Sequence, residues 1–436
     1  MRQIGIGIAG FGTIGVGVYK HLTGNRRLLC ERLGLELTVK KIADLDIETP
    51  RAGVATPRSI MTGDWQDLID DPQVQVVVEL MGGIQNPYKF VMAALEKGKI
   101  VVTANKALLA EHGKEIFAFA AEKRVPIFFE AAAAGGVPII KALKEAFVVN
   151  HIRSMHGIVN GTSNYILTRM TQAGLGFEEA LKEAQAAGYA EADPTLDVNG
   201  WDAAHKAIIL ASLAYGFWVN AADIHVEGIQ NITAADIEFA EKLGYTIKLL
   251  AVIKSDDNCT ENCPVEVRVH PTLVPQSHVL ASVNGVFNAI AVHGDVVGET
   301  LFYGRGAGQD ATASAVISDL AEAAVALEIP RPNFGFVPHG LYGKGKPISE
   351  VVTPYYLRLA VVDRPGVLAL ISGILSEEEI GISSVIQPEA HEEETVPLVL
   401  MLHNASQGQM DRAIGKIAAL DCVKRPPQVL RVETFA

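Results

Sequence analysis

Short apolar runs alternate with helical patterns along the first third of the chain. The apolar runs are rich in Val and Ile. Together, the runs and the helical patterns cover residues 4–9, 16–22, 37–42, 74–80, 91–96, 100–103 and 125–129. Parallel strands that are buried on both faces give continuous apolar runs, and their alternation with helices is typical of βαβ units. The pattern predicts an α/β fold that begins with a doubly wound parallel sheet over residues 1–134.

The pattern changes after the segment 135–138, which contains two glycines and a proline. Longer helical patterns at 177–187 and 201–213 then occur among strand patterns such as 265–269. This mixture predicts a second, mixed α/β domain over residues 135–304. An Ala-rich helical stretch lies within residues 305–330, and we expect it to pack back on the first domain.

Proline and glycine crowd the segment 331–354 and exclude any long regular element there, so we interpret it as a linker. Beyond it, six patterns have the order strand, helix, strand, strand, helix, strand. They cover residues 356–362, 366–375, 382–387, 397–403, 410–420 and 429–433. This order predicts a small, separate ferredoxin-like domain over residues 355–436.

Composition and charge narrow the class of protein. Hydrophobic residues make up 49% and charged residues 20%, as in ordinary globular proteins, and the net charge of −13 argues against a nucleic-acid partner. The apolar runs are too short to cross a membrane, and the first residues show no secretion signal, so we expect a cytoplasmic protein. The four cysteines are few and scattered, which predicts reduced thiols. Three residues separate Cys259 from Cys263, which favours a plain loop over a metal knuckle.

A glycine-rich turn follows the first predicted strand and opens a helix. It consists of Gly10, Phe11, Gly12, Thr13, Ile14 and Gly15. Glycines at this spacing allow a tight turn and a close approach to a pyrophosphate, which the free N–H groups of the helix start can bind. The turn therefore predicts a Rossmann-type site for a dinucleotide.

Asp44 ends the second predicted strand, where a carboxylate can bind the adenosine ribose and repel a 2′-phosphate. Arg51 lies in the same loop and could hold a 2′-phosphate instead. Asp44 could also be an ordinary loop carboxylate. Both NAD and NADP therefore remain open as cofactors.

Two groups of polar residues are candidates for the chemistry. Thr103 and Lys106 follow a buried strand, at the edge of the sheet where ligands gather in doubly wound folds. Asp202 and Lys206 share one face if a helix starts near Gly200, so the carboxylate could orient the ammonium group for proton transfer. The alternative is an exposed ion pair of no functional consequence. His205 points elsewhere on that helix and is interpreted as support.

The chain resembles the homoserine dehydrogenases, specifically the long bacterial type with a C-terminal ACT domain. The matching stretches span nearly the whole chain: 10–15, 103–108, 130–138, 157–167, 188–206, 227–251, 304–314 and 361–368. The resemblance implies reversible NAD(P)H-dependent reduction of L-aspartate 4-semialdehyde to L-homoserine, a step toward threonine and methionine. It implies that Lys206 is the general acid and base, that Asp202 orients it, and that Lys106 is a second catalytic lysine.

The resemblance also assigns binding residues. Substrate would be held by Glu191 and Asp197 and by the cleft-lining segment that contains Asn160, Gly161 and Thr162. Thr103, Lys106 and Gly308, the last in a loop that returns to the cofactor, would join the glycine turn in the cofactor site. A structural Na⁺ or K⁺ would be bound near Glu130, Ala133, Gly135 and Val137. Many relatives carry an arginine where the second strand ends, whereas this chain has Ala43 and Asp44, which puts NADP preference in doubt.

In the last domain, the turn that contains Asp363, Gly366 and Val367 resembles the ACT turn that binds an amino-acid effector, and threonine is the effector that the resemblance implies. ACT modules often bind at subunit interfaces, so the resemblance also implies a homodimer or homotetramer. A purely structural dimerisation role is the alternative for this domain. For the whole chain, the alternatives are another Rossmann-type amino-acid dehydrogenase or a non-catalytic sensor of nucleotide and amino acid.

Overall fold

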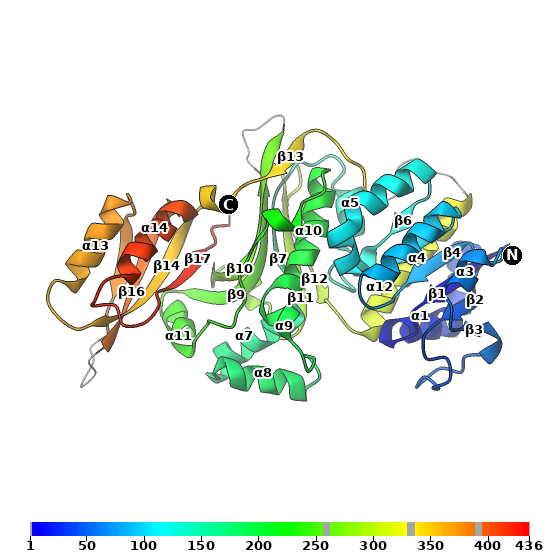
Figure 1. Ribbon diagram of the computed structural model, residues 1–436, viewed down its shortest axis with the longest axis horizontal. Coiled ribbons are helices and arrows are strands. Elements are labelled where there is room, and N and C mark those ends of the chain that lie inside the picture. The colour runs from blue at the N-terminus through cyan, green and yellow to red at the C-terminus, as the bar shows by residue number, and fades with distance from the viewer. Residues whose placement is uncertain (1, 256–261, 329–335, 389–394, 436) are drawn as a thin grey trace.

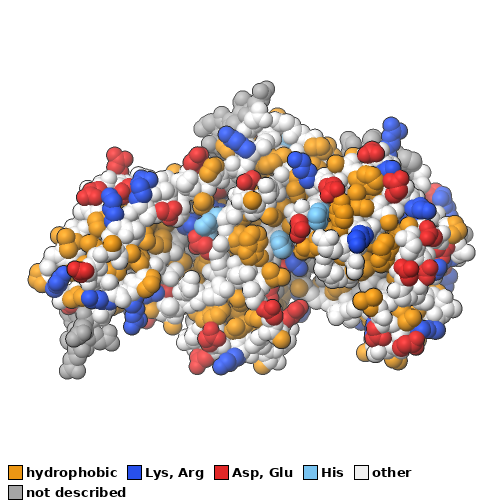
Figure 2. Space-filling view, in the orientation of Figure 1, with side chains coloured by type: hydrophobic (Ala, Val, Ile, Leu, Met, Phe, Trp, Pro, Cys, Tyr) orange, Lys and Arg blue, Asp and Glu red, His pale blue; other side chains and the backbone are white. Residues whose placement is uncertain are grey.

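The computed structural model describes residues 2–255, 262–328, 336–388 and 395–435, and it forms three units along its long axis (Figure 1). The N-terminal unit lies at one end, the C-terminal unit lies at the other, and a middle unit joins them. On the face shown in Figure 2, Lys and Arg side chains are interspersed with Asp and Glu side chains over all three units. The net charge of −13 is therefore not gathered in one region of that face.

The N-terminal unit is built on a six-stranded sheet in the order β3-β2-β1-β4-β5-β6, and every pairing in it is parallel. The strands are β1 (Arg2–Ala9), β2 (Leu35–Ala43), β3 (Met61–Thr62), β4 (Val76–Glu79), β5 (Ile100–Thr103) and β6 (Ile127–Phe128). All residues of β4 and β5 are buried, because helices cover both faces of the sheet. The predicted doubly wound parallel sheet is confirmed.

Six helices pack on this sheet. They are α1 (Thr13–Gly24), α2 (Arg26–Leu33), α3 (Gln66–Asp70), α4 (Gln85–Glu96), α5 (Lys106–Lys123) and, from much later in the chain, α12 (Gln309–Glu328). Helix α12 contacts α1, β4 and β5, and it buries Ala313, Val316 and Leu320. Its apolar face completes the core of the N-terminal unit.

The middle unit is a mixed α/β structure. Its strands are β7 (Ile152–Ile158), β8 (His225–Val226), β9 (Tyr245–Ser255), β10 (Cys263–Pro275), β11 (Phe287–Gly294) and β12 (Gly298–Arg305). Its helices are α6 (Ile139–Lys141), α7 (Gly161–Ala173), α8 (Phe177–Ala186), α9 (Thr195–Val198), α10 (Trp201–Tyr215) and α11 (Ala234–Lys242). Helix α10 contacts β9 and β10 and is buried along most of its length. The middle sheet therefore fixes the helix that carries Asp202 and Lys206.

The C-terminal unit has the predicted order of elements: β14 (Val352–Val362), α13 (Val367–Glu377), β15 (Ile382–Ile386), β16 (Thr395–Ser406), α14 (Gln407–Ala418) and β17 (Gln428–Val432). Its antiparallel strands lie in the order β17-β14-β16-β15, which is a ferredoxin-like arrangement. Strand β17 also pairs in parallel with β10 of the middle unit. One sheet therefore runs through both units, because the open edge of β17 is available for pairing. The domain boundary at residue 355 stays a prediction.

Short elements complete the described chain. They are the 3₁₀ turns η1 (Arg58–Ile60), η2 (Glu130–Ala132), η4 (Ala221–Asp223), η5 (Val279–Ser282) and η6 (Ile348–Glu350), the π-helical turn η3 (Ala142–Ala146), and strand β13 (Tyr342–Gly345), which pairs with β10. Strand β13 and turn η6 both lie within residues 331–354, the segment that we interpret as a linker.

The cysteines depart from expectation at one position. Cys263 is disulfide-bonded, whereas Cys30 and Cys422 carry free thiols. The prediction of four reduced thiols is therefore wrong for Cys263, because sequence spacing alone does not show which thiols the fold brings together. Cys259 and the next two residues of its predicted loop lie outside the described residues. Within the described residues, no helix combines the length and the apolar character that a membrane span needs.

Candidate active site

The glycine turn after β1 has three glycines with different physical roles. Gly10 has φ +96°, and a Cβ atom there would lie 2.5 Å from the carbonyl oxygen of Leu80. A Cβ atom on Gly15 would lie 2.2 Å from the carbonyl oxygen of Gly10. Gly12, at the start of α1, instead faces open space, with nothing within 4 Å of its Cβ position. Two glycines thus permit the turn, and the third leaves room for an anion at the helix start.

A pocket of about 340 Å³ opens beside this turn. Its lining includes Gly10, Gly12, Asp44, Trp65 and Met81, so it combines the turn with the ends of neighbouring strands. The Phe11 side chain points into the core, where it packs edge-on against Tyr19. Thr13 and Ile14 form the first turn of α1, next to the pocket. The pocket suits an adenosine and pyrophosphate group in size and in position.

Asp44 and Arg51, which the sequence offered as alternatives, form one cluster at the rim of the pocket. The Asp44 carboxylate accepts hydrogen bonds from the N–H groups of Phe11 (2.5 Å) and Asp46 (2.9 Å). Arg51 lies 3.2 Å from Asp44 and 3.1 Å from Asp46. Hydrogen bonds from Thr49 and from Arg51 hold the pKa of Asp46 well below its usual range. One cation is thus shared by two carboxylates.

The ends of β4 and β5 carry a buried polar pair. Thr103 donates a hydrogen bond of 2.6 Å to Glu79, and burial raises the pKa of this carboxyl group to about 7. Asn105 then caps α5 by accepting from the N–H group of Leu108 (3.0 Å), and Lys106 is the first residue of that helix. Glu79 is not among the site residues predicted from the sequence. Its position at the end of an apolar run, like that of Thr103, was the available signal.

A later segment returns to the glycine turn. Gly308 has φ +114°, and it directly precedes α12. The next residue, Gln309, donates a hydrogen bond of 2.9 Å to the carbonyl oxygen of Thr13. The structure therefore brings Gly308 near the predicted cofactor residues.

Two lysines from different units meet one carboxylate. Gly200 (φ +88°) sets the start of α10, and two residues later Asp202 places its Oδ2 atom 2.7 Å from Nζ of Lys206, one helical turn further along. Asp202 Oδ1 lies 3.2 Å from Lys106 Nζ, at the start of α5. Lys206 also donates a hydrogen bond of 2.6 Å to the carbonyl oxygen of Val159. Asp202 therefore orients both ammonium groups at the junction between the N-terminal and middle units.

The environment of this cluster excludes the alternative of an exposed surface pair. Side chains of Asp202 and Lys206 are each only 11% exposed, whereas that of Lys106 is 39% exposed. Burial by itself would raise the pKa of Asp202, but the charges of Lys206 and Lys106 outweigh it and hold this pKa well below its usual range. Asp202 is therefore held as a carboxylate despite its burial.

Asn160 connects this cluster to Asp197. Its amide nitrogen lies 2.7 Å from Asp197 Oδ1 and 2.8 Å from Asp202 Oδ2. Its amide oxygen caps α7 by accepting from the N–H group of Ser163 (2.7 Å). Burial raises the pKa of Asp197, the hydrogen bond from Asn160 opposes this, and the nearby charge of Asp202 adds to the rise. The structure thus joins four predicted site residues, Asn160, Asp197, Asp202 and Lys206.

Other predicted substrate residues lie at the margin of the cluster. Thr162 donates a hydrogen bond of 2.8 Å to the carbonyl oxygen of Tyr189, and Gly161 packs so close to Val286 that a Cβ atom would lie 2.8 Å from its carbonyl oxygen. Glu191 lies on the exposed loop before α9, and within the described residues its carboxylate has no hydrogen-bond or ion-pair partner. His205 is half-buried, and burial lowers its pKa.

The residues predicted to bind a cation lie at the crossing between the N-terminal and middle units. Glu130 caps α6 with its carboxylate, which accepts from the N–H groups of Ile140 (3.0 Å) and Lys141 (2.8 Å). Ala133, Gly135 and Val137 are buried nearby in the chain. Within the described ranges, no group of three or more His, Cys, Asp or Glu side chains is arranged to hold a metal ion.

The predicted effector residues lie at the start of α13. Gly366 has φ +94° and precedes the helix, and Val367 is its first, buried residue. Asp363 accepts a hydrogen bond of 3.4 Å from Gln387, near the end of β15.

Comparisons with known proteins agree with this architecture. The family model described as homoserine dehydrogenase, NAD binding domain, matches residues 10–130, and the model described as homoserine dehydrogenase matches residues 138–321. The homoserine dehydrogenase of Neisseria gonorrhoeae is 43% identical over 100% of both chains, and that of Pseudomonas aeruginosa is 44% identical over 99% of both.

Solved structures give the same result. A homoserine dehydrogenase from Thiobacillus denitrificans superposes with a TM-score of 0.91 at 41% identity, over 99% of both chains. A hyperthermophilic archaeal homoserine dehydrogenase in complex with NADPH superposes with a TM-score of 0.64 at 26% identity, over 76% of this chain and 100% of the other. The chain therefore belongs to the homoserine dehydrogenase family.

Proposed function

We propose that this chain interconverts L-homoserine and L-aspartate 4-semialdehyde with NAD or NADP, and that Lys206 transfers the proton. The single observation that carries this proposal is the convergence of Lys106 and Lys206 on Asp202, at the junction between the unit with the glycine turn and the middle unit. A bound nicotinamide would exchange the hydride with the substrate carbon. The residues of the chain then need to exchange one proton with the substrate oxygen.

Hydrogen bonding supports Lys206 in this role. An ammonium group has three hydrogens. Among the described residues, Lys206 donates two of them, one to Asp202 and one to the carbonyl oxygen of Val159. One hydrogen remains for a substrate oxygen. During reduction the ammonium group donates this proton to the oxygen, and during oxidation the neutral amine takes it back. Lys106, which is more exposed, would stabilise the negative charge that develops on the oxygen.

Substrate binding would use the carboxylates beside this pair. We propose that Glu191 and Asp197 bind the substrate ammonium group, since charge-assisted hydrogen bonds to carboxylates are strong. The Glu191 carboxylate is available for this purpose because it has no partner among the described residues. Asn160, Gly161 and Thr162 would line the cleft beside Asp197, at the start of α7.

The cofactor site would consist of the glycine turn together with Thr103, Lys106 and Gly308. We propose that NAD is preferred over NADP. Support comes from the rim of the pocket, where the carboxylates of Asp44 and Asp46 share the single cation of Arg51. This cluster carries a net negative charge, which would repel a 2′-phosphate.

We propose three further properties. A structural monovalent cation would be bound by Glu130 and by the carbonyl groups of Ala133, Gly135 and Val137, where Ala134 and Gly135 both have positive φ. An amino-acid effector such as threonine would bind at Asp363, Gly366 and Val367, because the N–H groups at the start of α13 suit a carboxylate. A homodimer or homotetramer would be the working assembly.

A steady-state assay tests the main proposal. The full-length protein should oxidise L-homoserine in the presence of NAD or NADP, with the higher kcat/KM for NAD, and should reduce aspartate semialdehyde in the reverse direction. Threonine should be added in a parallel series. Turnover of a different amino-acid alcohol, with none of homoserine, would assign the chain another substrate. Cofactor binding without turnover would instead favour a sensor.

A further inference from the structure

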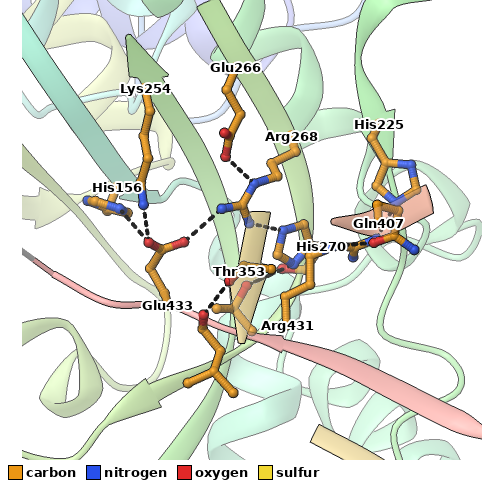
Figure 3. A network of polar contacts seen from close by, with 12 residues as sticks. His156, His225, Lys254, Glu266, Arg268, His270, Thr353, Gln407, Arg431 and Glu433 are labelled. Atoms are coloured by element: carbon orange, nitrogen blue, oxygen red, sulfur yellow. Dashed lines mark hydrogen bonds and ion pairs between the residues drawn. The ribbon is translucent and has the colours of Figure 1, made fainter. Parts of the chain in front are cut away.

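The C-terminal strand brings two buried charges into the middle unit. Arg431 and Glu433 are 3% and 1% exposed, and they belong to the polar network shown in Figure 3. Glu433 accepts from Arg268 (3.0 Å) and is ion-paired with Lys254. These contacts, together with the pairing of β17 and β10, fasten the C-terminal unit to the middle sheet.

Arg431 reaches a second group of residues on the other side of this network. Its Nη2 atom lies 2.9 Å from Glu227 Oε1, 2.7 Å from Gln407 Oε1 and 3.1 Å from His225 Nε2. Burial by itself would raise the pKa of Glu227, but the hydrogen bond from His225 and the charge of Arg431 outweigh it and hold this pKa well below its usual range. Glu227 is therefore a fixed carboxylate that Arg431 binds from the C-terminal unit.

The segment that follows Glu227 supports the start of α10. The N–H group of Ile229 donates a hydrogen bond of 2.8 Å to the carbonyl oxygen of Val198. Gly228 packs so tightly that a Cβ atom on it would lie 2.3 Å from the same oxygen, and a Cβ atom on Gly200 would lie 3.1 Å from the carbonyl oxygen of Glu227. Gly200 is the residue that starts α10, two positions before Asp202. A continuous series of contacts thus leads from Arg431 to Asp202.

We infer that Glu227 is a positioning residue, through which Arg431 of the C-terminal unit fixes the start of α10 and with it the Asp202–Lys206 pair. This inference rests on the proposed function for its kinetic consequence, but not for its structural one. Loss of the Glu227 charge leaves Arg431 buried without an ion-pair partner among the described residues and loosens residues 227–229. A displacement of catalytic groups by a fraction of an ångström lowers turnover more than it lowers affinity.

Another ion pair between the same two units provides a matched control. Arg358 on β14 lies 2.6 Å from Asp236 Oδ1, and its Nη2 atom donates a hydrogen bond of 3.0 Å to Asp236 Oδ2. Asp236 also caps α11, together with Thr233. Helix α11 carries none of the predicted site residues. The Arg358–Asp236 pair therefore joins the units as the Arg431–Glu227 pair does, but it does not lie against the start of α10.

The experiment compares full-length Glu227→Gln, Glu227→Asp and Asp236→Asn with the unmodified chain. Hydrogen exchange of backbone amides in residues 198–208 is the first readout. We expect faster exchange there in Glu227→Gln, partial recovery in Glu227→Asp and no change in Asp236→Asn. We also expect kcat for homoserine oxidation to fall about tenfold in Glu227→Gln, with the cofactor KM unchanged.

Unchanged exchange in Glu227→Gln overturns the inference, and so does an equal change at residues 198–208 in Asp236→Asn. If the unmodified chain does not oxidise homoserine, the proposed function fails, and the exchange data still decide the positioning role. If a variant fails to fold, Arg431→Lys replaces it. Lysine keeps the positive charge but cannot make the contacts of the guanidinium group with Glu227, Gln407 and His225 together. Amide exchange in residues 198–208 should then rise by as little as in Glu227→Asp.

Discussion

Lys106 Nζ lies 3.2 Å from Asp202 Oδ1, and this ion pair joins the first turn of α5 in the N-terminal unit to the first turn of α10 in the middle unit. The other oxygen of the same carboxylate binds Lys206. Two cations brought this close would repel each other without the shared anion. Asp202 therefore holds the two lysines in position.

Replacement of Asp202 by Asn keeps the size of the side chain but removes its charge. We expect kcat for homoserine oxidation to fall by at least about tenfold, because the ammonium groups lose their common partner and their orientation. Glu238→Gln breaks the exposed Glu238–Lys242 pair on α11 and is the control. Equal kcat values for Asp202→Asn and the unmodified chain would exclude this role.

Gly12→Ala separates cofactor binding from folding. The backbone angles of Gly12 (φ −77°, ψ −157°) suit alanine, and its Cβ position faces open space. We expect stability to change by less than about 0.5 kcal/mol, and the Kd for NAD to rise by at least about tenfold, because the methyl group occupies the place of the pyrophosphate. Isothermal titration measures the affinity, and Gly24→Ala on the same helix serves as the control. An unchanged Kd would place the pyrophosphate elsewhere.

Asp319 should make stability depend on pH. It is 1% exposed on α12, and burial raises its pKa to about 8, from a usual value of 3.8, despite the nearby charge of Lys141. Between these pH values the folded chain holds a proton that the unfolded chain releases, so stability falls as pH rises from 4 to 8. Asp319→Asn removes this loss. Its stability relative to the unmodified chain should therefore increase over that window by more than about 1 kcal/mol.

Urea denaturation at pH 5, 7 and 8.5 measures this effect. Glu328→Gln, on the same helix but at the surface against Arg2, should show no such trend. A constant difference between Asp319→Asn and the unmodified chain at all three pH values would mean that Asp319 is ionised in the folded protein.

Local chemistry made much of the fold predictable. Continuous apolar runs predicted β4 and β5. A strand that is buried on both faces has no face in water, so its sequence does not alternate between apolar and polar residues. The turn from Gly10 to Gly15 was predictable because few other sequences allow its backbone conformation and close packing. The pairing of Asp202 with Lys206 followed from helical spacing alone, once Gly200 was taken as the start of a helix.

Contacts between distant segments were not predictable in this way. No local pattern indicates that Lys106 meets Asp202, that the open edge of β17 pairs with β10, or that Cys263 forms a disulfide. Whether the Asp202–Lys206 pair is buried or exposed also depends on what the fold places around it. These features arise from tertiary packing. A resemblance to known proteins or the structure itself can reveal them, but the periodicity of the sequence cannot.

The role of Lys206 is the central claim, and Lys206→Ala tests it with a matched control. Lys242→Ala removes the lysine of another Asp/Glu–Lys pair with the same four-residue spacing, but on the exposed face of α11. Both variants should retain the circular dichroism spectrum and the cofactor affinity of the unmodified chain.

The most direct measurement is kcat for homoserine oxidation by Lys206→Ala at saturating cofactor and substrate. We predict a fall of at least about a hundredfold, the usual scale for loss of a general acid and base, with no fall in Lys242→Ala. Turnover by Lys206→Ala within about twofold of the unmodified chain would contradict the account, because that chain would then transfer the proton without Lys206.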